Sequence, residues 1–227
     1  MDITDLKLTE QIHHQKGDCL IVVDMQNDFM PGGALPVVGG DTLVPGVNSI
    51  MESFLGSTLP IVLTQDWHPF RHRSFASAHV GKKSFDLHSE PGIGPVLWPD
   101  HCVQGTPGAE FHYLLDVNSA QAIIRKGFHQ DVDSYSGFLE NDRTTTTGLD
   151  GYLKSRQVKR IFICGLALDY CVFYTALDGF ELGYEVKVLI DLTKPVGSPP
   201  ESISQALRAL SIKGIAFVKS SGINPSG

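Results

Sequence analysis

RIFICGLALDYCV, residues 160–172, places a short apolar run directly before an amphipathic pattern. The run that ends at Gly165 predicts a buried strand, and the spacing of apolar residues from Asp169 to about Leu182 predicts a helix. Cys171 then lies in the first turn of that helix. With Asp169 as the helix cap, free N–H groups and the positive end of the helix dipole would lower the thiol pKa from about 8.5 towards neutrality. A cysteine nucleophile and a buried structural cysteine are both open at this point.

Strands and helices alternate along the rest of the chain, and no repeat interrupts them. Apolar runs that predict strands lie at 19–23, 60–64, 120–125, 185–190 and 214–219, and helical patterns lie at 42–54, 149–155 and 200–210. This alternation predicts an α/β fold with an open, mostly parallel sheet of about six strands and helices on both faces. In such a fold, ligands bind outside the carboxyl ends of the strands.

Composition limits the classes of protein and partner. Of the 227 residues, 42% are hydrophobic and 19% are charged, which predicts one domain, 18–227, after an N-terminal tail, 1–17. The net charge of -7 comes without a basic stripe, so nucleic acid and anionic membranes are not expected partners. No apolar run approaches the roughly 18 residues that span a bilayer, and residues 1–16 lack the apolar core of a signal peptide. We therefore expect a cytoplasmic protein and leave a homo-oligomer open.

Charged residues follow two of the predicted strands. Asp24 follows the run at 19–23, and Lys126 follows the run at 120–125. Because the carboxyl ends of parallel strands meet at one edge of a sheet, we expect both residues to lie beside Cys171. An aspartate there can take the thiol proton, while a lysine keeps the carboxylate ionised and stabilises the thiolate. Each residue alone is more often a turn former or a solvated strand exit, so the hypothesis depends on their shared location.

A second group of polar residues follows the next strand and continues into a long loop. Asp66 and His68 lie two residues apart, and His101 lies farther along the loop. One carboxylate and two imidazoles suit Zn²⁺, Fe²⁺ or Mn²⁺, with positions left open for water or a ligand. His72 is a candidate additional ligand or a support for the ligands, and Cys102 is interpreted as structural. Because the chain has only four well-separated cysteines, we expect reduced thiols rather than a disulfide framework.

Five segments, taken in order, resemble the signatures of the nicotinamidases, which are isochorismatase-like cysteine hydrolases. These segments are 23–29 (VDMQNDF), 64–69 (TQDWHP), 98–106 (WPDHCVQGT), 125–127 (RKG) and 165–172 (GLALDYCV). The resemblance runs from about residue 18 to the end of the chain. Its first and last segments are typical of the whole superfamily. The second and third are typical of the nicotinamidase branch, because the related isochorismatases lack the metal site.

This resemblance implies a role for each matched residue. The catalytic triad that it implies is Asp24, Lys126 and Cys171. The ligands of the one divalent ion that it implies, Zn²⁺ before Fe²⁺ or Mn²⁺, are Asp66, His68 and His101. It also implies a cis peptide between Leu166 and Ala167 and an oxyanion hole formed by the N–H groups of Ala167 and Cys171. The residues implied around the pyridine ring are Phe29, Trp98, Tyr135 and Leu166.

The reaction implied by the resemblance is hydrolysis of nicotinamide to nicotinate and ammonia through a cysteine thioester, as a step of NAD salvage. Three alternatives stay open. A related cysteine hydrolase of another small amide would need the triad but not the metal. A metallohydrolase would use a metal-bound hydroxide and leave Cys171 structural. A binding protein on the same fold would release no ammonia.

Overall fold

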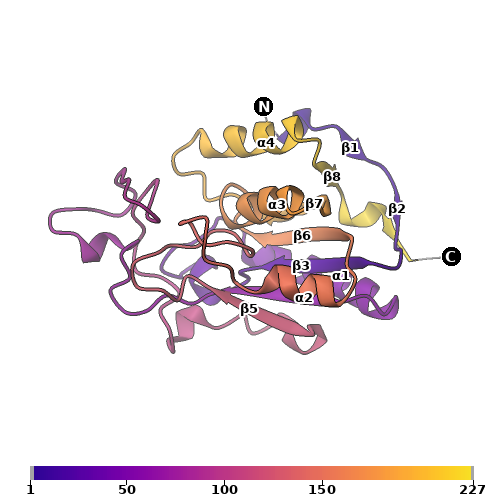
Figure 1. Cartoon of the computed structure of the whole chain (residues 1–227), viewed down its shortest axis with the longest axis horizontal. Coiled ribbons are helices and arrows are strands. Elements are labelled where there is room, and N and C mark those ends of the chain that lie inside the picture. The colour runs from indigo at the N-terminus through magenta and orange to yellow at the C-terminus, as the bar shows by residue number, and fades with distance from the viewer. Residues whose placement is uncertain (1–2, 226–227) are drawn as a thin grey trace.

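The computed structural model describes residues 3–225 and contains a seven-stranded parallel sheet (Figure 1). The strand order is β1-β8-β7-β6-β3-β4-β5, and all hydrogen-bonded neighbours run parallel. The strands are β1 (Leu8–Thr9), β3 (Asp18–Val23), β4 (Ile61–Asp66), β5 (Ala122–Lys126), β6 (Arg160–Leu166), β7 (Glu185–Lys194) and β8 (Ala216–Val218). The predicted α/β fold with a mostly parallel sheet is confirmed.

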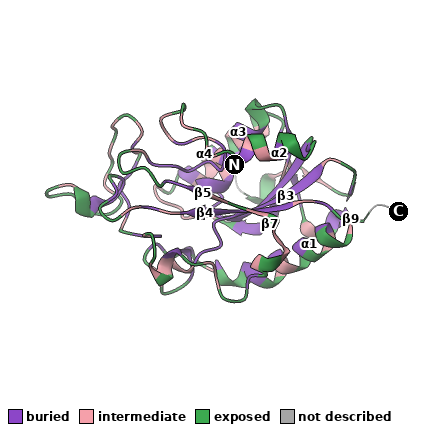
Figure 2. Ribbon diagram, turned by 60° about the horizontal axis from the view of Figure 1, so that its bottom comes forward, coloured by how far each residue is buried: buried purple, intermediate pink, exposed green. Residues whose placement is uncertain are grey.

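Helices cover both faces of this sheet (Figure 2). On one face α1 (Val44–Gly56) packs against β3 and β4, and on the other α3 (Cys171–Glu181) packs against β6 and β7. α2 (Leu149–Ser155) lies on the same side as α3, and α4 (Ser202–Ile212) contacts α3. Because both faces are covered, β3 and β6 are buried along their whole length, which is why their sequences are nearly continuous apolar runs. Within residues 3–225, no helix combines the length and apolar composition needed to cross a bilayer.

The N-terminal segment lies along the edge of the sheet. β1 pairs with β8 through Leu8 and Phe217, and β2 (Ile12–His13) pairs with β9 (Ile223–Asn224) in a separate two-stranded sheet. β1 accounts for the seventh strand, where the sequence predicted about six, because a two-residue strand has no periodicity to reveal it. The division into a tail, 1–17, and a domain, 18–227, stays a prediction, and its outermost residues, 1–2 and 226–227, lie outside the described residues.

The connection between β4 and β5 is long and contains no α-helix in residues 67–121. It extends beyond the carboxyl ends of the strands (Figure 1) and includes the short 3-10 helices η4 (Ala76–Ala78), η5 (Pro107–Ala109) and η6 (Val117–Ser119). The loop returns to its own start, because the His68 amide donates to the Cys102 carbonyl oxygen at 3.0 Å. This contact brings His101 back beside His68 at the end of β4. Long loops inside compact domains often carry functional residues.

The end of β6 requires glycine. Gly165 has a φ of +103°, and a Cβ atom at this position would lie 2.1 Å from the Val23 carbonyl oxygen of β3. The next peptide, between Leu166 and Ala167, is cis, which confirms the geometry implied by the sequence resemblance. Three further residues lead from Ala167 to Cys171, the first residue of α3. The candidate nucleophile therefore stands next to the end of β3.

Candidate active site

The structure brings Asp24, Lys126 and Cys171 together at the carboxyl edge of the sheet. Asp24 follows β3, Lys126 ends β5 and Cys171 begins α3. Lys126 Nζ lies 2.9 Å from Asp24 Oδ2 and 3.4 Å from Cys171 Sγ. Asp24 and Lys126 are fully buried, and Cys171 has 6% of its surface exposed. The expectation that these three residues share one edge is therefore confirmed, and only the thiol is accessible to a small molecule.

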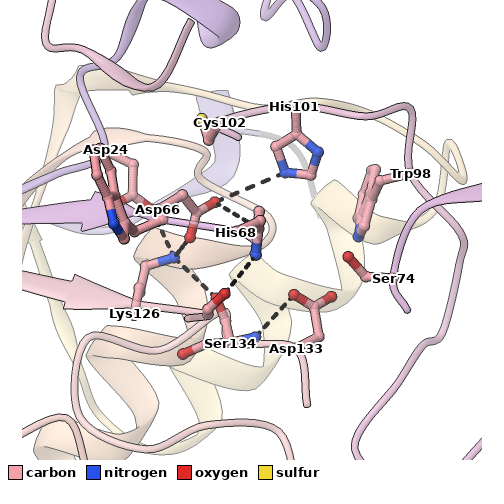
Figure 3. Close-up of polar contacts among 12 residues, drawn as sticks. Asp24, Asp66, His68, Ser74, Trp98, His101, Cys102, Lys126, Asp133 and Ser134 are labelled. Atoms are coloured by element: carbon pink, nitrogen blue, oxygen red, sulfur yellow. Dashed lines mark hydrogen bonds and ion pairs between the residues drawn. The ribbon is translucent and has the colours of Figure 1, made fainter. Parts of the chain in front are cut away.

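Lys126 also connects this group to the candidate metal ligands (Figure 3). Its ammonium forms a short ion pair with Asp66 and donates to the Ser134 carbonyl oxygen at 2.9 Å. Burial favours the neutral amine, but the carboxylates of Asp24 and Asp66 outweigh it and hold the pKa of Lys126 well above its ordinary value. The lysine is therefore a fixed cation between two carboxylates, and it is not suited to exchange protons at neutral pH.

The start of α3 differs from the sequence prediction. The capping position is Tyr170, with φ of -131° and ψ of -98°, and no side chain caps the helix. The Asp169 carboxylate instead accepts hydrogen bonds from the amides of Val196 and Gly197, at 2.8 and 2.9 Å. The prediction of Asp169 as the cap is wrong, because its carboxylate has stronger partners in a loop distant in sequence.

Burial raises the pKa of the Cys171 thiol well above its ordinary value, although Lys126 opposes this shift. The prediction of a lowered thiol pKa is therefore also wrong, since loss of water at the sulfur outweighs the nearby cation. Burial likewise raises the pKa of Asp24 despite the Lys126 ammonium. A protonated thiol beside a carboxylate of increased basicity suits proton transfer within the pair, and neither residue titrates independently of the other.

Thr64 supports Asp24 and was not singled out from the sequence. Its hydroxyl donates to Asp24 Oδ1 at 2.6 Å, which leaves Oδ2 to face Lys126. Thr64 lies two residues before Asp66 on β4, and side chains two apart in a strand point to the same face. This period of two is the signal that could have identified Thr64 once Asp66 was a candidate.

Asp66, His68 and His101 form a compact donor group. Asp66 Oδ2 lies 3.7 Å from His68 Nε2 and 3.9 Å from His101 Nε2, and one ligand atom from each lies within 4.8 Å of the others. His68 Nδ1 bonds to the Gly127 carbonyl oxygen at 2.9 Å and His101 Nδ1 to that of Pro99 at 2.8 Å. A carbonyl can only accept, so both imidazoles carry their proton on Nδ1 and direct the Nε2 lone pair towards Asp66. This donor set fits a divalent metal ion.

Two neighbours of His68 hold it in this orientation. Gly127 has a φ of +68°, and a Cβ atom there would lie 2.5 Å from His68 Cε1, so only glycine lets the imidazole approach. On the other side His72 packs against His68 with ring centroids 4.5 Å apart. Both ring nitrogens of His72 have hydrogen-bond partners, Ser74 Oγ at 2.7 Å and the Val132 carbonyl oxygen at 3.0 Å. His72 therefore supports a ligand rather than adding one.

A cavity opens between the thiol and the donor group. Three of the four residues expected around the substrate line it, namely Phe29, Trp98 and Tyr135. Leu166 does not line the cavity and is fully buried. The lining residues that sequence analysis missed are Leu35, Asp133, Tyr170 and Val196, which lie in loops or turns that no periodic pattern marks.

The aromatic wall and the backbone of the cavity are both well defined. The Tyr135 hydroxyl accepts a hydrogen bond from Trp98 Nε1 at 3.1 Å and donates to the Gly94 carbonyl oxygen at 2.9 Å, which fixes both rings. Ala167 lines the cavity beside Cys171. Among the described residues, the amides of Ala167 and Cys171 make no backbone hydrogen bond outside the regular elements, so both are free to donate to a ligand oxygen.

The isochorismatase domain family matches residues 18–219, which span most of the described chain. The chain belongs to the isochorismatase family. Among family members, the nicotinamidase of Acinetobacter baylyi is 47% identical over 210 residues, which cover 92% of this chain and 96% of that protein. The predicted membership in the nicotinamidase branch is confirmed.

Solved structures of isochorismatase-family proteins agree with this assignment. A nicotinamidase and pyrazinamidase of Acinetobacter baumanii superposes with a TM-score of 0.87 and 44% identity, covering 91% of this chain and 98% of that one. The pyrazinamidase of Pyrococcus horikoshii in complex with zinc has a TM-score of 0.74 and 42% identity, covering 89% of this chain and 99% of that one. The family therefore includes a close structural relative that holds a metal.

Proposed function

We propose that this isochorismatase-family chain is a nicotinamidase, which hydrolyses nicotinamide to nicotinate and ammonia. The observation that carries this proposal is that Cys171 and the donor group of Asp66, His68 and His101 line one cavity. A cysteine hydrolase of simple amides would need only the triad, whereas this cavity offers an attacking thiol and a metal site together. The names of the nicotinamidases of Acinetobacter baylyi and Acinetobacter baumanii support the same substrate.

The first step is proton transfer followed by attack. Asp24 takes the proton of the Cys171 thiol, and the sulfur then forms a bond to the carboxamide carbon of the substrate. The carbonyl π electrons move to oxygen, which becomes an oxyanion that accepts hydrogen bonds from the amides of Ala167 and Cys171. Lys126 Nζ lies 2.9 Å from Asp24 Oδ2 and 3.4 Å from Cys171 Sγ. Its positive charge therefore stabilises the carboxylate before the proton transfer and the thiolate after it.

The second step releases ammonia and then nicotinate. Asp24 returns the proton to the leaving nitrogen as the carbon–nitrogen bond breaks, which leaves a nicotinoyl thioester on Cys171. Asp24 next accepts a proton from a water molecule that attacks the thioester carbon, and the sulfur departs as the thiolate and regains the proton. Thr64, bonded to Asp24 at 2.6 Å, keeps the carboxylate oriented through both transfers.

The donor group and the aromatic residues orient the ring. Asp66, His68 and His101 would hold a divalent ion, which would supply Lewis-acid chemistry to orient the ring of the substrate. We propose Zn²⁺ as this ion, supported by two imidazole donors and by the zinc complex of the Pyrococcus horikoshii relative. Trp98 and Tyr135, fixed by their mutual hydrogen bond, form an aromatic wall of the ring pocket. Use of nicotinate in NAD salvage, a cytoplasmic location and a homo-oligomer stay predictions.

The experiment is ammonia release from nicotinamide by the zinc-loaded protein. We expect Cys171→Ala to lower kcat by at least about 10³-fold, as removal of a catalytic nucleophile does. Chelation should abolish turnover and Zn²⁺ should restore it, with Fe²⁺ and Mn²⁺ as the competing metals. The matched control is Cys164→Ala, which removes a buried thiol of β6 that does not line the cavity and should keep activity.

Three outcomes would contradict this proposal at different points. No ammonia from the loaded wild type would exclude nicotinamide as the substrate. Unchanged turnover in Cys171→Ala would exclude the thiol as nucleophile and favour a metal-bound hydroxide. Full turnover without metal would favour a related cysteine hydrolase of another small amide, because that class needs only the triad.

A further inference from the structure

A second cluster of metal-binding side chains lies outside the active site, in the long loop between β4 and β5. It consists of His79, His88 and Glu90, each of which offers a ligand atom within 4.8 Å of the other two. All three side chains are partly exposed, so an ion could reach them from solvent. None of them lines the catalytic cavity. Two imidazoles and one carboxylate repeat the donor types of the Asp66, His68 and His101 group.

Hydrogen bonds and ion pairs define which nitrogens of this cluster remain available to a ligand. His79 Nε2 bonds to the Arg73 carbonyl oxygen at 2.7 Å, and a carbonyl can only accept, so the proton is on Nε2 and the Nδ1 lone pair is free. His88 Nε2 is buried and has no hydrogen-bond partner among the described residues, although it lies 3.2 Å from Glu90 Oε1. The two rings are adjacent, with centroids 4.7 Å apart. A buried imidazole nitrogen beside a carboxylate oxygen, with a second imidazole next to it, is an arrangement that a divalent ion can bridge.

The charge of the cluster indicates which ions it would take. The Arg73 guanidinium forms a short ion pair with Glu90 Oε2, which leaves Oε1 as the donor towards His88. Because Arg73 offsets the single carboxylate, attraction by charge alone is weak, and hard ions such as Mg²⁺ or Ca²⁺ would gain little. The two imidazole nitrogens instead favour Zn²⁺, Ni²⁺ or Cu²⁺.

We propose that His79, His88 and Glu90 form a second divalent transition-metal site, separate from the catalytic one. The ion would join two parts of the loop that support the substrate cavity. His79 follows η4, where the Ala76 amide donates to the Trp98 carbonyl oxygen at 2.8 Å. His88 and Glu90 belong to a hairpin-like segment, 87–96, whose Gly94 carbonyl oxygen accepts the Tyr135 hydroxyl. Binding at this site therefore fixes the backbone behind Trp98 and Tyr135.

The test is the number of zinc ions bound per chain. The protein is equilibrated by dialysis against excess Zn²⁺ and its metal content is measured by elemental analysis. We expect two ions in the wild type and one in His88→Gln and Glu90→Gln. Two controls complete the set: His101→Gln should lose the catalytic ion and keep the other, and His13→Gln, which changes an exposed histidine of β2, should keep both.

A second measurement locates the ion. Amide hydrogen exchange across 76–97 should slow when the second equivalent binds to the wild type, and should not change in His88→Gln. A wild type that binds one ion overturns the proposal. So does a second ion that persists in both His88→Gln and Glu90→Gln, because it would then be adventitious or bound elsewhere. The result does not depend on the substrate, so failure of the nicotinamidase assignment would leave it unaffected.

Discussion

The two donor groups of this chain have the same chemistry in opposite surroundings. Asp66, His68 and His101 are nearly fully buried, and Lys126 compensates the carboxylate from within the core. The His79, His88 and Glu90 group lies in a loop, and Arg73 compensates its carboxylate from the surface, with 44% of its side chain exposed. In the buried group the charges are stabilised only by protein neighbours, whereas in the loop group the ion pair of Arg73 and Glu90 is partly exposed, so water can solvate both charges. A shared donor set therefore does not imply a shared energetic role.

The largest difference should appear when each compensating cation is removed. Lys126→Met removes the ammonium that neutralises the buried carboxylates of Asp24 and Asp66, and loss of one member of a buried pair costs about 3–5 kcal/mol of unfolding free energy. Arg73→Met breaks an exposed pair, which is worth about 1 kcal/mol or less. Denaturant unfolding of both variants measures the contrast. Equal losses would show that burial does not distinguish the two groups.

A second effect is the pH dependence contributed by the buried group. Burial lowers the pKa of His101 to about 4, against about 6.5 in an unfolded chain. Between these values the unfolded state binds a proton that the folded state does not, so stability falls as the pH falls through this window. We expect metal-free wild type to lose on the order of 2 kcal/mol between pH 7 and pH 5 from this group. His101→Gln should lose less over the same range; an identical loss would contradict the shift.

The smallest effect concerns the support of Asp24. Thr64→Val removes the 2.6 Å hydrogen bond to Asp24 while keeping the shape of the side chain. We expect kcat to fall about tenfold, the equivalent of about 1.4 kcal/mol, with little change in KM because Thr64 does not line the cavity. Thr64→Ser retains the hydroxyl and is the matched control, which should recover most of kcat. A change confined to KM would contradict a role in positioning Asp24.

Prediction from the sequence succeeded where a local pattern determines position. The apolar runs of β3, β4 and β5 mark strands, of which β3 and β4 are buried and β5 is a partly exposed edge strand, so Asp24, Asp66 and Lys126 at their carboxyl ends could be placed at one edge of the sheet. It failed at the start of α3. Aspartate is a common helix cap, but the Asp169 carboxylate accepts hydrogen bonds from the amides of Val196 and Gly197 instead. Nothing near residue 169 in the sequence indicates that contact.

Electrostatic properties were also beyond prediction from the sequence. A helix N-terminus and a nearby lysine suggest a lowered thiol pKa, but burial raises the pKa of the Cys171 thiol and outweighs the opposing effect of Lys126. Thr64 and Asp133 were missed for a related reason. Thr64 matters because its hydroxyl contacts Asp24, and Asp133 because it lines the substrate cavity. Both contacts join segments that are far apart in the sequence, so only the fold creates them.

By itself, the sequence determined the parallel α/β sheet, the edge at which the site lies and the residue types available there. These follow from hydrophobic periodicity and strand direction, which are local properties of the chain. Only the tertiary structure decided that Lys126 bridges two carboxylates, that Asp169 anchors a loop instead of a helix, and that His79, His88 and Glu90 converge. Burial, proton position and distance arise from contacts between segments far apart in sequence, so no local pattern contains them.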